Sequence, residues 1–184
     1  MKKMIFALLF VILSVHAFSQ SGDLTIGAKG GYVFSTDYYK GILYGFDVAY
    51  HLADPLEVAF TGLFNPDISY TNPMQVKKQL SVYSANLDLR LYLIHHEVWA
   101  TGPTLGGQYY VVDDKSNEYG ADKAWGFNMG WHLRVNLTDN VKINGGYRYT
   151  NANAKDRNSW DDSAKFPLSH HLIYLGVAYT FELK

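Results

Sequence analysis

Residues 123–137 read KAWGFNMGWHLRVNL, and every second position from Trp125 onward is apolar. Such alternation places successive side chains on opposite faces of a β-strand, whereas a helical period would mix the polar and apolar positions. The stretch is much longer than the roughly 5–6 residues of a common soluble strand, and is long enough to cross a bilayer at a tilt. Its apolar face carries Trp125, Phe127, Met129, Trp131, Leu133, Val135 and Leu137, and its polar face carries Gly126, Asn128, Gly130, His132, Arg134 and Asn136.

Seven further stretches alternate in the same way, which predicts an all-β chain. The eight expected strands are 24–34, 41–52, 56–64, 80–93, 98–112, 123–137, 141–150 and 170–181. The connecting segments 53–55, 95–97 and 138–140 are short, while 35–40, 65–79, 113–122 and 151–168 are longer and polar. Pro66 and Pro73 are expected to keep 65–79 outside the sheet, since proline cannot donate to a ladder. Long and short links that alternate predict an eight-stranded antiparallel up-and-down transmembrane β-barrel, with its turns in the periplasm.

The N-terminal residues have the pattern of a cleaved signal peptide. Lys2 and Lys3 precede an apolar run over 4–15, and Ala17 and Ser19 are the small residues expected before a cut at Ser19–Gln20. The predicted organisation is a signal peptide over 1–19 and one outer-membrane barrel domain over 20–184. The chain has no Cys, which excludes a lipid-anchored N-terminus, a disulfide scaffold and a thiolate metal site.

Composition narrows the class of protein further. Without Lys2 and Lys3, 14 of the 16 basic residues remain against 17 acidic ones, so no basic field for nucleic acid is expected. Aromatic residues make up 16% of the chain and include 15 Tyr, which suits the aromatic girdles of a barrel wall. Outside the signal peptide the sequence lacks an apolar run long enough for a spanning helix, so a membrane crossing must use strands. We expect no cofactor and no metal.

The apolar face is predicted to face lipid and the polar face to face the lumen. A soluble barrel with an apolar cavity is the alternative, but a face rich in Gly and Asn fits a crowded lumen better than a solvated exterior. The predicted lipid-facing aromatic girdle comprises Tyr44, Phe60, Phe64, Trp125, Phe127, Trp131, Tyr147, Tyr179 and Phe181. The predicted lumen network comprises Lys29, Asp47, Glu57, Asp88, Arg90, Arg134, Lys142 and Arg148.

These inward charges suggest either a selective pore or proton path, or a plug of salt-bridged side chains. The plug is favoured because a barrel of eight strands has room for little more than side chains. Lys29 and Asp47 each lie five residues from the expected turn-side ends of adjacent strands. We therefore predict that they pair inside the barrel, either directly or diagonally.

The chain resembles the small eight-stranded outer-membrane barrels of the OmpA, OmpX and OmpW kind, without a further domain. Its last strand, HLIYLGVAYTF over 171–181, resembles the C-terminal assembly signal of that family, although Glu182, Leu183 and Lys184 follow the final aromatic residue. The resemblance implies a place in the outer membrane of a Gram-negative bacterium. It also implies contact with outer-membrane lipids and with the barrel-assembly machinery through the last strand. We expect a monomer.

Three local patterns suggest chemistry, and each also has a structural explanation. Ser169, His170 and His171, with Asp161 and Asp162 nearby, suggest a hydrolase, because some outer-membrane barrels are lipid A deacylases. Adjacent strand residues point to opposite faces, however, so Ser169 and His170 are expected to diverge. The same argument makes the pairs His95-His96 and His170-His171 rim residues rather than metal ligands. The pairs Gly30-Gly31 and Gly106-Gly107 are not followed by a helix and predict no phosphate loop.

The resulting hypothesis is a structural or surface-interaction protein with a side-chain-plugged lumen and no enzymatic activity. A narrow channel or a carrier for small hydrophobic molecules is the alternative. Pro103 favours that alternative slightly, because proline in a wall strand removes a ladder hydrogen bond and could open a lateral gap. A lipid-modifying enzyme is the third possibility.

The loop pattern generates a prediction about orientation. Protease added to intact cells should cut within 65–79 and 151–168 and should leave the turn at 138–140 intact. Introduced cysteines at Ser159 and Asn140 provide the matched measurement with an impermeant thiol reagent. Labelling of the cysteine at 140 together with protection at 159 would reverse the assigned orientation.

Overall fold

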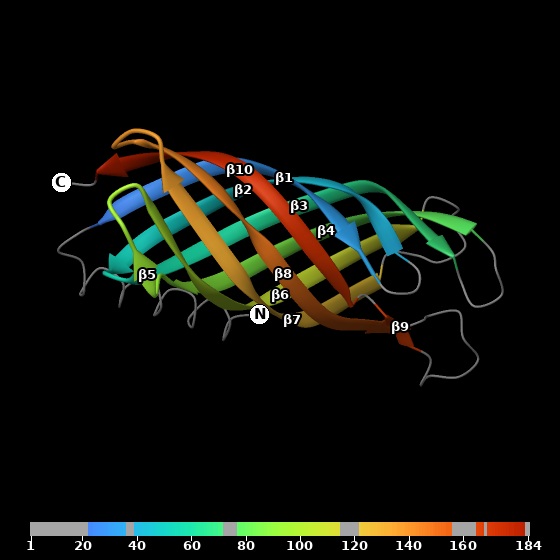
Figure 1. Cartoon of the computed structure of the whole chain (residues 1–184). Coiled ribbons are helices and arrows are strands. Elements are labelled where there is room, and N and C mark those ends of the chain that lie inside the picture. Colours follow the sequence, from blue (N-terminus) through green and yellow to red (C-terminus); the bar gives the residue numbers. More distant parts are fainter. Residues whose placement is uncertain are drawn as a thin grey trace.

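The computed structural model describes residues 22–35, 39–71, 77–114, 122–155, 165–167 and 169–182, and they form a β-barrel (Figure 1). Eight long strands make the wall, and two short strands, β5 (Ile94–His95) and β9 (Lys165–Pro167), lie at its ends. The expected signal peptide, 1–19, lies outside the described residues. The wall strands are β1 Asp23–Phe34, β2 Tyr39–Ala53, β3 Leu56–Thr71, β4 Lys77–Leu91, β6 Trp99–Asp114, β7 Asp122–Asn136, β8 Val141–Lys155 and β10 His170–Glu182.

The wall closes on itself through the first and last strands. Each wall strand pairs antiparallel with its neighbours along the chain, and β1 pairs with β10 from Asp23↔Glu182 to Phe34↔His171. Every wall strand therefore has two partners. A closed ladder leaves no open edge, which is what allows strands to cross a hydrocarbon layer. The predicted eight-stranded antiparallel barrel is confirmed.

The two ends of the barrel differ. We call the end with the connections 54–55, 92–98 and 137–140 the turn rim, and the opposite end the loop rim. At the turn rim a cis Asp54–Pro55 bond joins β2 to β3, and β5 (Ile94–His95) pairs with β6 through Thr101 and Ala100. Asp23 and Glu182 also meet at the turn rim, so the described ends of the chain lie side by side (Figure 1).

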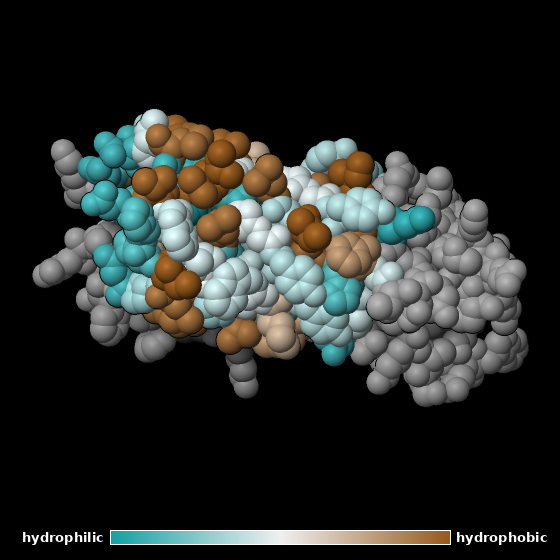
Figure 2. Space-filling model, viewed as in Figure 1, coloured by the Kyte–Doolittle hydropathy of each residue, from teal (hydrophilic) through white to brown (hydrophobic). Residues whose placement is uncertain are grey.

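Alternation along each strand separates two surfaces. On β10, Ile173 is 56% exposed and its neighbour Tyr174 is 4% exposed, and the pattern repeats along the strand. Figure 2 shows hydrophobic residues spread over the visible wall and hydrophilic ones gathered at the turn rim, on the left. Among the residues that the structure describes, no helix is long and apolar enough to cross a membrane.

The strands extend further toward the loop rim than the sequence pattern predicts. The expectation that 65–79 lies outside the sheet is wrong, because β3 continues to Thr71 and β4 begins at Lys77. Pro66 is accommodated by a register shift in the β3–β4 ladder between Asn65 and Ile68. A bulge leaves one residue unpaired, so a missing N–H is tolerated there. Segment 151–168 is also partly strand, since β8 reaches Lys155 and β9 (Lys165–Pro167) pairs with it.

Pro103 does not interrupt the wall. It faces Trp131 in a β6–β7 ladder that runs from Trp99 to Val112 without a register shift. Pairing of β6 with β4 ends at Thr104, so Pro103 lies where β6 changes partner from β4 to β5. A lateral gap would need a break in the pairing of wall strands, and a register shift of that kind lies near Pro66 instead.

The exposed apolar wall generates a prediction about stability. Val177 is 59% exposed and lies near the middle of β10. Val177→Arg should lower the free energy of unfolding by about 2–4 kcal/mol, because a cation near the bilayer midplane is costly. Urea unfolding of the protein from phospholipid vesicles measures the loss. His95→Arg, at an exposed site in β5, is the control and should change stability little. Equal effects of the two substitutions would contradict a lipid-facing Val177.

Candidate functional site: the barrel interior

The charged cluster inside the barrel centres on Asp47 of β2. Lys29 Nζ lies 2.8 Å from Asp47 Oδ1, and Arg90 Nη2 lies 2.7 Å from the same oxygen. Thr61 Oγ1 donates to it at 2.5 Å and accepts from Lys29 Nζ at 3.1 Å. The predicted Lys29–Asp47 pair is confirmed in its diagonal form, because Lys29 faces Gly45 and Asp47 faces Gly27 in the ladder.

The cluster continues toward the turn rim through Glu57 of β3. Arg90 Nη1 donates to Glu57 Oε1 at 2.8 Å, and Arg134 Nη1 donates to Oε2 at 3.4 Å. Tyr92 OH donates to Glu57 Oε1 at 3.3 Å, and the Arg134 guanidinium lies 4.3 Å from the centre of the Tyr92 ring. Arg90 therefore bridges two carboxylates. The connected charges come from β1, β2, β3, β4 and β7.

A second ion pair spans the interior. Arg148 of β8 donates to Asp88 of β4, and both side chains are almost completely buried. β4 and β8 are separated in the wall by β6 and β7, so the two side chains reach across the lumen. Gly106 and Gly130 make room for them. A Cβ on Gly106 would meet the Asp88 carboxylate, and one on Gly130 would lie 2.9 Å from the Arg148 Cα.

Several buried polar atoms around this second pair have no protein partner among the described residues. They include Arg148 Nε and Nη1, Asp88 Oδ1 and both side-chain atoms of Asn128. Unpaired polar groups in a low-dielectric interior cost free energy unless water satisfies them. We therefore expect ordered water between Asp88, Asn128 and Arg148.

The interior of the barrel opens at the turn rim. A polar cavity of about 250 Å³ lies there. Its lining includes Lys142, which is half-buried and is the remaining member of the predicted lumen network, beside the carboxylate of Glu57. The other lining residues are Asp23, Thr25, His51, Asp54 and Arg134. The eight predicted lumen residues thus all point inward, seven into the buried clusters and Lys142 into this mouth.

An apolar layer fills the interior near the loop rim, and the sequence reasoning did not predict it. Its members share the inward register of the charged residues, which is the signal that could have revealed them. Tyr174 links the layer to the polar part, since its hydroxyl lies 2.9 Å from His132 Nδ1 and its ring centre 5.0 Å from Lys29 Nζ. The layer comprises Val33, Leu43, Leu63, Val82, Tyr110, Val112, Ala124, Ala152, Leu172 and Tyr174.

The nine residues of the predicted aromatic girdle are all exposed on the outer wall. Some form ring pairs with neighbours on adjacent strands or on the same strand. Phe64 stacks on Tyr83 at a centroid distance of 4.9 Å, and Tyr109 lies 4.8 Å from Trp125. Tyr179 and Phe181 form an edge-to-face pair at 4.8 Å near the turn rim. Such contacts add to the stability of neighbouring strands.

Among the described residues, those that suggested hydrolase or metal chemistry are not brought together. Ser169 Oγ donates to Asn151 Oδ1 at 3.4 Å, His170 points inward beside Tyr110, and His171 lies outward against Phe34. His96 is exposed and stacks on Trp99. Asp161 and Asp162 lie outside the described residues. Within the described ranges, no group of three or more His, Asp or Glu side chains is placed to hold a metal ion.

Comparison with known proteins agrees with this architecture. The family model of the outer membrane protein beta-barrel domain matches residues 5–181, nearly the whole chain. The chain belongs to this family. It is therefore an integral protein of the outer membrane of a Gram-negative bacterium. A search of the curated proteins finds no match.

Solved structures share the fold at low sequence identity. Neisserial surface protein A is 16% identical, with a TM-score of 0.54, over 87% of this chain and 97% of that one. Escherichia coli outer membrane protein W is 12% identical, with a TM-score of 0.53, over 88% and 98%. Yersinia pestis Ail, in complex with the heparin analogue sucrose octasulfate, is 15% identical, with a TM-score of 0.51, over 89% and 100%. At these identities the likeness concerns the fold alone.

The ion cluster predicts unequal losses of stability. Asp47→Leu removes the only carboxylate that the described structure pairs with Lys29, and one of the two that are paired with Arg90, whereas Lys29→Met leaves Asp47 paired with Arg90. Asp47→Leu should therefore cost about 3–5 kcal/mol, the usual loss when a buried charge is left unpaired, and Lys29→Met less. Urea unfolding from phospholipid vesicles provides the measurement.

The double variant Lys29→Met/Asp47→Leu should recover part of the summed loss, because no unpaired lysine remains. Lys142→Met, in the open mouth, is the matched control and should change stability little. Strictly additive losses for Lys29 and Asp47 would show that the pair contributes nothing.

Proposed function

We propose that this protein is a structural or surface-interaction barrel whose lumen is filled by its own side chains. Its wall would act as a rigid support for the segments that join the strands at the loop rim. The observation that supports this proposal most strongly is the buried ion network centred on Asp47. It draws side chains from five strands into the middle of the barrel.

Two successive layers would close the lumen. The ion network and the Asp88–Arg148 pair occupy the middle of the barrel, where Arg90 and Arg148 are 2% and 1% exposed. The apolar layer lies between them and the loop rim. An ion moving through would have to separate buried charge pairs and then cross a region whose lining is largely apolar. Both steps are costly in a low-dielectric interior.

The proposal also includes two partners and an oligomeric state. Outer-membrane lipids would cover the apolar wall. The barrel-assembly machinery would recognise β10, whose alternating apolar residues end at Phe181. The protein would work as a monomer, because the closed ladder leaves no strand edge that a second copy could extend.

A carrier for small hydrophobic molecules is the second candidate, and one feature favours it. The β2–β3 ladder shifts register between Lys40 and Tyr44, and the β3–β4 ladder shifts at Pro66, both beside the apolar layer. A hydrophobic molecule that passes sideways between the interior and the membrane would require weakened pairing between wall strands beside an apolar interior. The space at this level is small, about 10 Å³, which argues for a closed resting state.

A lipid-modifying enzyme is the least supported candidate, and we propose that the protein has no such activity. A nucleophilic serine needs a base within hydrogen-bond reach. Ser169 instead bonds Asn151, and its neighbour His170 points into the barrel.

The filled lumen predicts that the refolded protein does not conduct. In planar bilayers the wild type should give no sustained current, because the interior charges are paired and the apolar layer excludes ions. Insertion is verified on the same preparation by protection of the wall strands from protease. A sustained current from verified barrels would defeat the filled-lumen proposal. Uptake of a small hydrophobic dye into vesicles by a non-conducting barrel would favour the carrier.

A further inference from the structure

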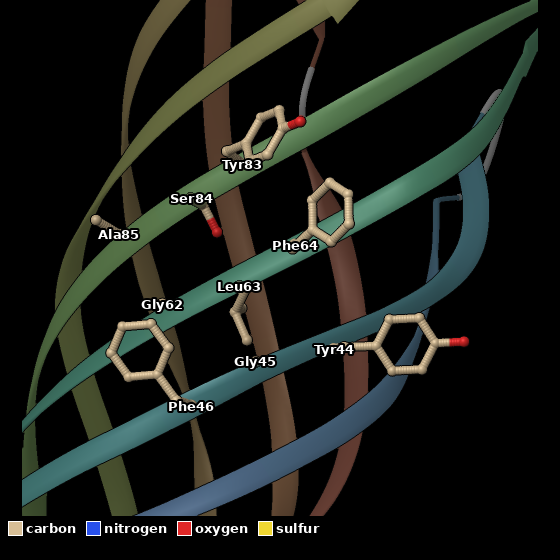
Figure 3. Close-up of a pocket in the computed structure, with 9 residues that line it drawn as sticks. All are labelled: Tyr44, Gly45, Phe46, Gly62, Leu63, Phe64, Tyr83, Ser84 and Ala85. Carbon is tan, nitrogen blue, oxygen red and sulfur yellow. The ribbon is translucent and has the colours of Figure 1, made fainter.

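The outer wall contains an apolar hollow of about 340 Å³ on β2, β3 and β4 (Figure 3). Its surface is almost entirely apolar. The outward residues that shape it are Tyr44, Phe46, Gly62, Phe64, Tyr83 and Ala85. It lies on the surface that faces the hydrocarbon of the membrane, so water is not its natural occupant.

The hollow exists because small residues alternate with large rings. Gly62 and Ala85 face outward on neighbouring strands and sit opposite each other in the ladder, so the floor between them is low. Phe46 stands on one side, and the stacked Phe64 and Tyr83 rings stand on the other. A Cβ on Gly62 would meet the Phe46 ring, which shows how closely that ring lies over the glycine. The result is a shallow apolar groove bordered by flat rings, and its size and chemistry suit a hydrocarbon chain.

The hollow is polar at one end only. The hydroxyl groups of Tyr44 and Tyr83 both point toward the loop rim in Figure 3, the direction in which β2 runs back to Tyr39. Lys40 shares the outward face of β2 with Tyr44 and is exposed at the rim. They are four positions apart, which is about 13 Å along a strand at roughly 3.3 Å per residue. An acyl chain that begins at a headgroup beside Lys40 would therefore reach the hollow within the roughly 15 Å depth of one hydrocarbon leaflet.

We propose that this hollow binds an anionic membrane lipid, with one acyl chain lying in the hollow and the phosphate headgroup at Lys40. The apolar floor and ring borders account for the chain, and Lys40 accounts for the headgroup, toward which the tyrosine hydroxyls point. Lysine reaches the headgroup region by extending its charged end out of the hydrocarbon. A protein partner fits less well, because its polar backbone would have to enter the hydrocarbon layer to reach the hollow.

Photo-crosslinking tests the site. The full barrel is reconstituted in phosphatidylcholine vesicles that contain a small fraction of phosphatidylglycerol with a photoactivatable acyl chain. Crosslinked peptides are then mapped by mass spectrometry. The label should concentrate on peptides from β2, β3 and β4. Labelling spread evenly around the wall would overturn the proposal.

Two pairs of variants separate the chain from the headgroup. Ala85→Leu should fill the hollow and abolish the excess labelling of these strands, whereas Gly145→Leu, on the outer face of β8, should not. Gly145 has space for a side chain, and a leucine at position 85 would occupy the hollow itself, so both variants should fold. Lys40→Ala should lower the excess labelling of β2, β3 and β4 by about fivefold, which is the effect of one lysine near an anionic surface. Lys123→Ala, an exposed lysine on β7, is its control.

A phosphatidylcholine probe with the same photoactivatable chain completes the test. It should label the hollow less than the phosphatidylglycerol probe does, and the difference should vanish in Lys40→Ala. Equal labelling by the two probes in the wild type would overturn the role of Lys40. Unchanged excess labelling in Ala85→Leu would overturn the assignment of the hollow.

Discussion

The backbone ladder that joins β1 to β10 is the interaction on which the rest of the structure depends. A strand in hydrocarbon has no water to satisfy its N–H and C=O groups, so each of its edges must pair with another strand. Twelve residue pairs from Asp23↔Glu182 to Phe34↔His171 supply the last of these partners. Once the wall is closed in a membrane, the side chains of each strand point alternately outward and inward. The apolar side chains face the lipid, and the polar ones are confined to the interior.

Confinement then determines how the polar residues interact. A barrel of eight strands encloses little space, so the inward charges are buried whether or not they have a function. Asp47 and Glu57 are satisfied by cations from other strands, and glycines such as Gly106 leave room for the side chains that reach across. Pairing of this kind offsets the cost of removing charges from water. A role as a filled support for surface segments is consistent with that packing.

The parts of the structure that depend on local pattern were predictable from the sequence. Alternation over 123–137 predicts β7 to within one residue at each end, and strand heights predict the Lys29–Asp47 pair. Contacts across the lumen were not predictable, because no ladder register relates β4 to β8. The Asp88–Arg148 pair is the clearest case. The continuation of β3 through Pro66 was not predictable for a different reason. A bulge removes the need for its N–H, and a bulge leaves no reliable mark in one sequence.

Closure is most directly tested by nuclear magnetic resonance of the barrel in lipid nanodiscs. The account predicts short-range contacts between backbone protons of facing β1 and β10 residues, such as Thr25 with Thr180 and Gly27 with Ala178. It also predicts that amides of β1 and β10 exchange with solvent as slowly as those of β3 and β4. Missing contacts between the first and last strands, together with fast exchange along both of them, would show an open sheet and would contradict the account.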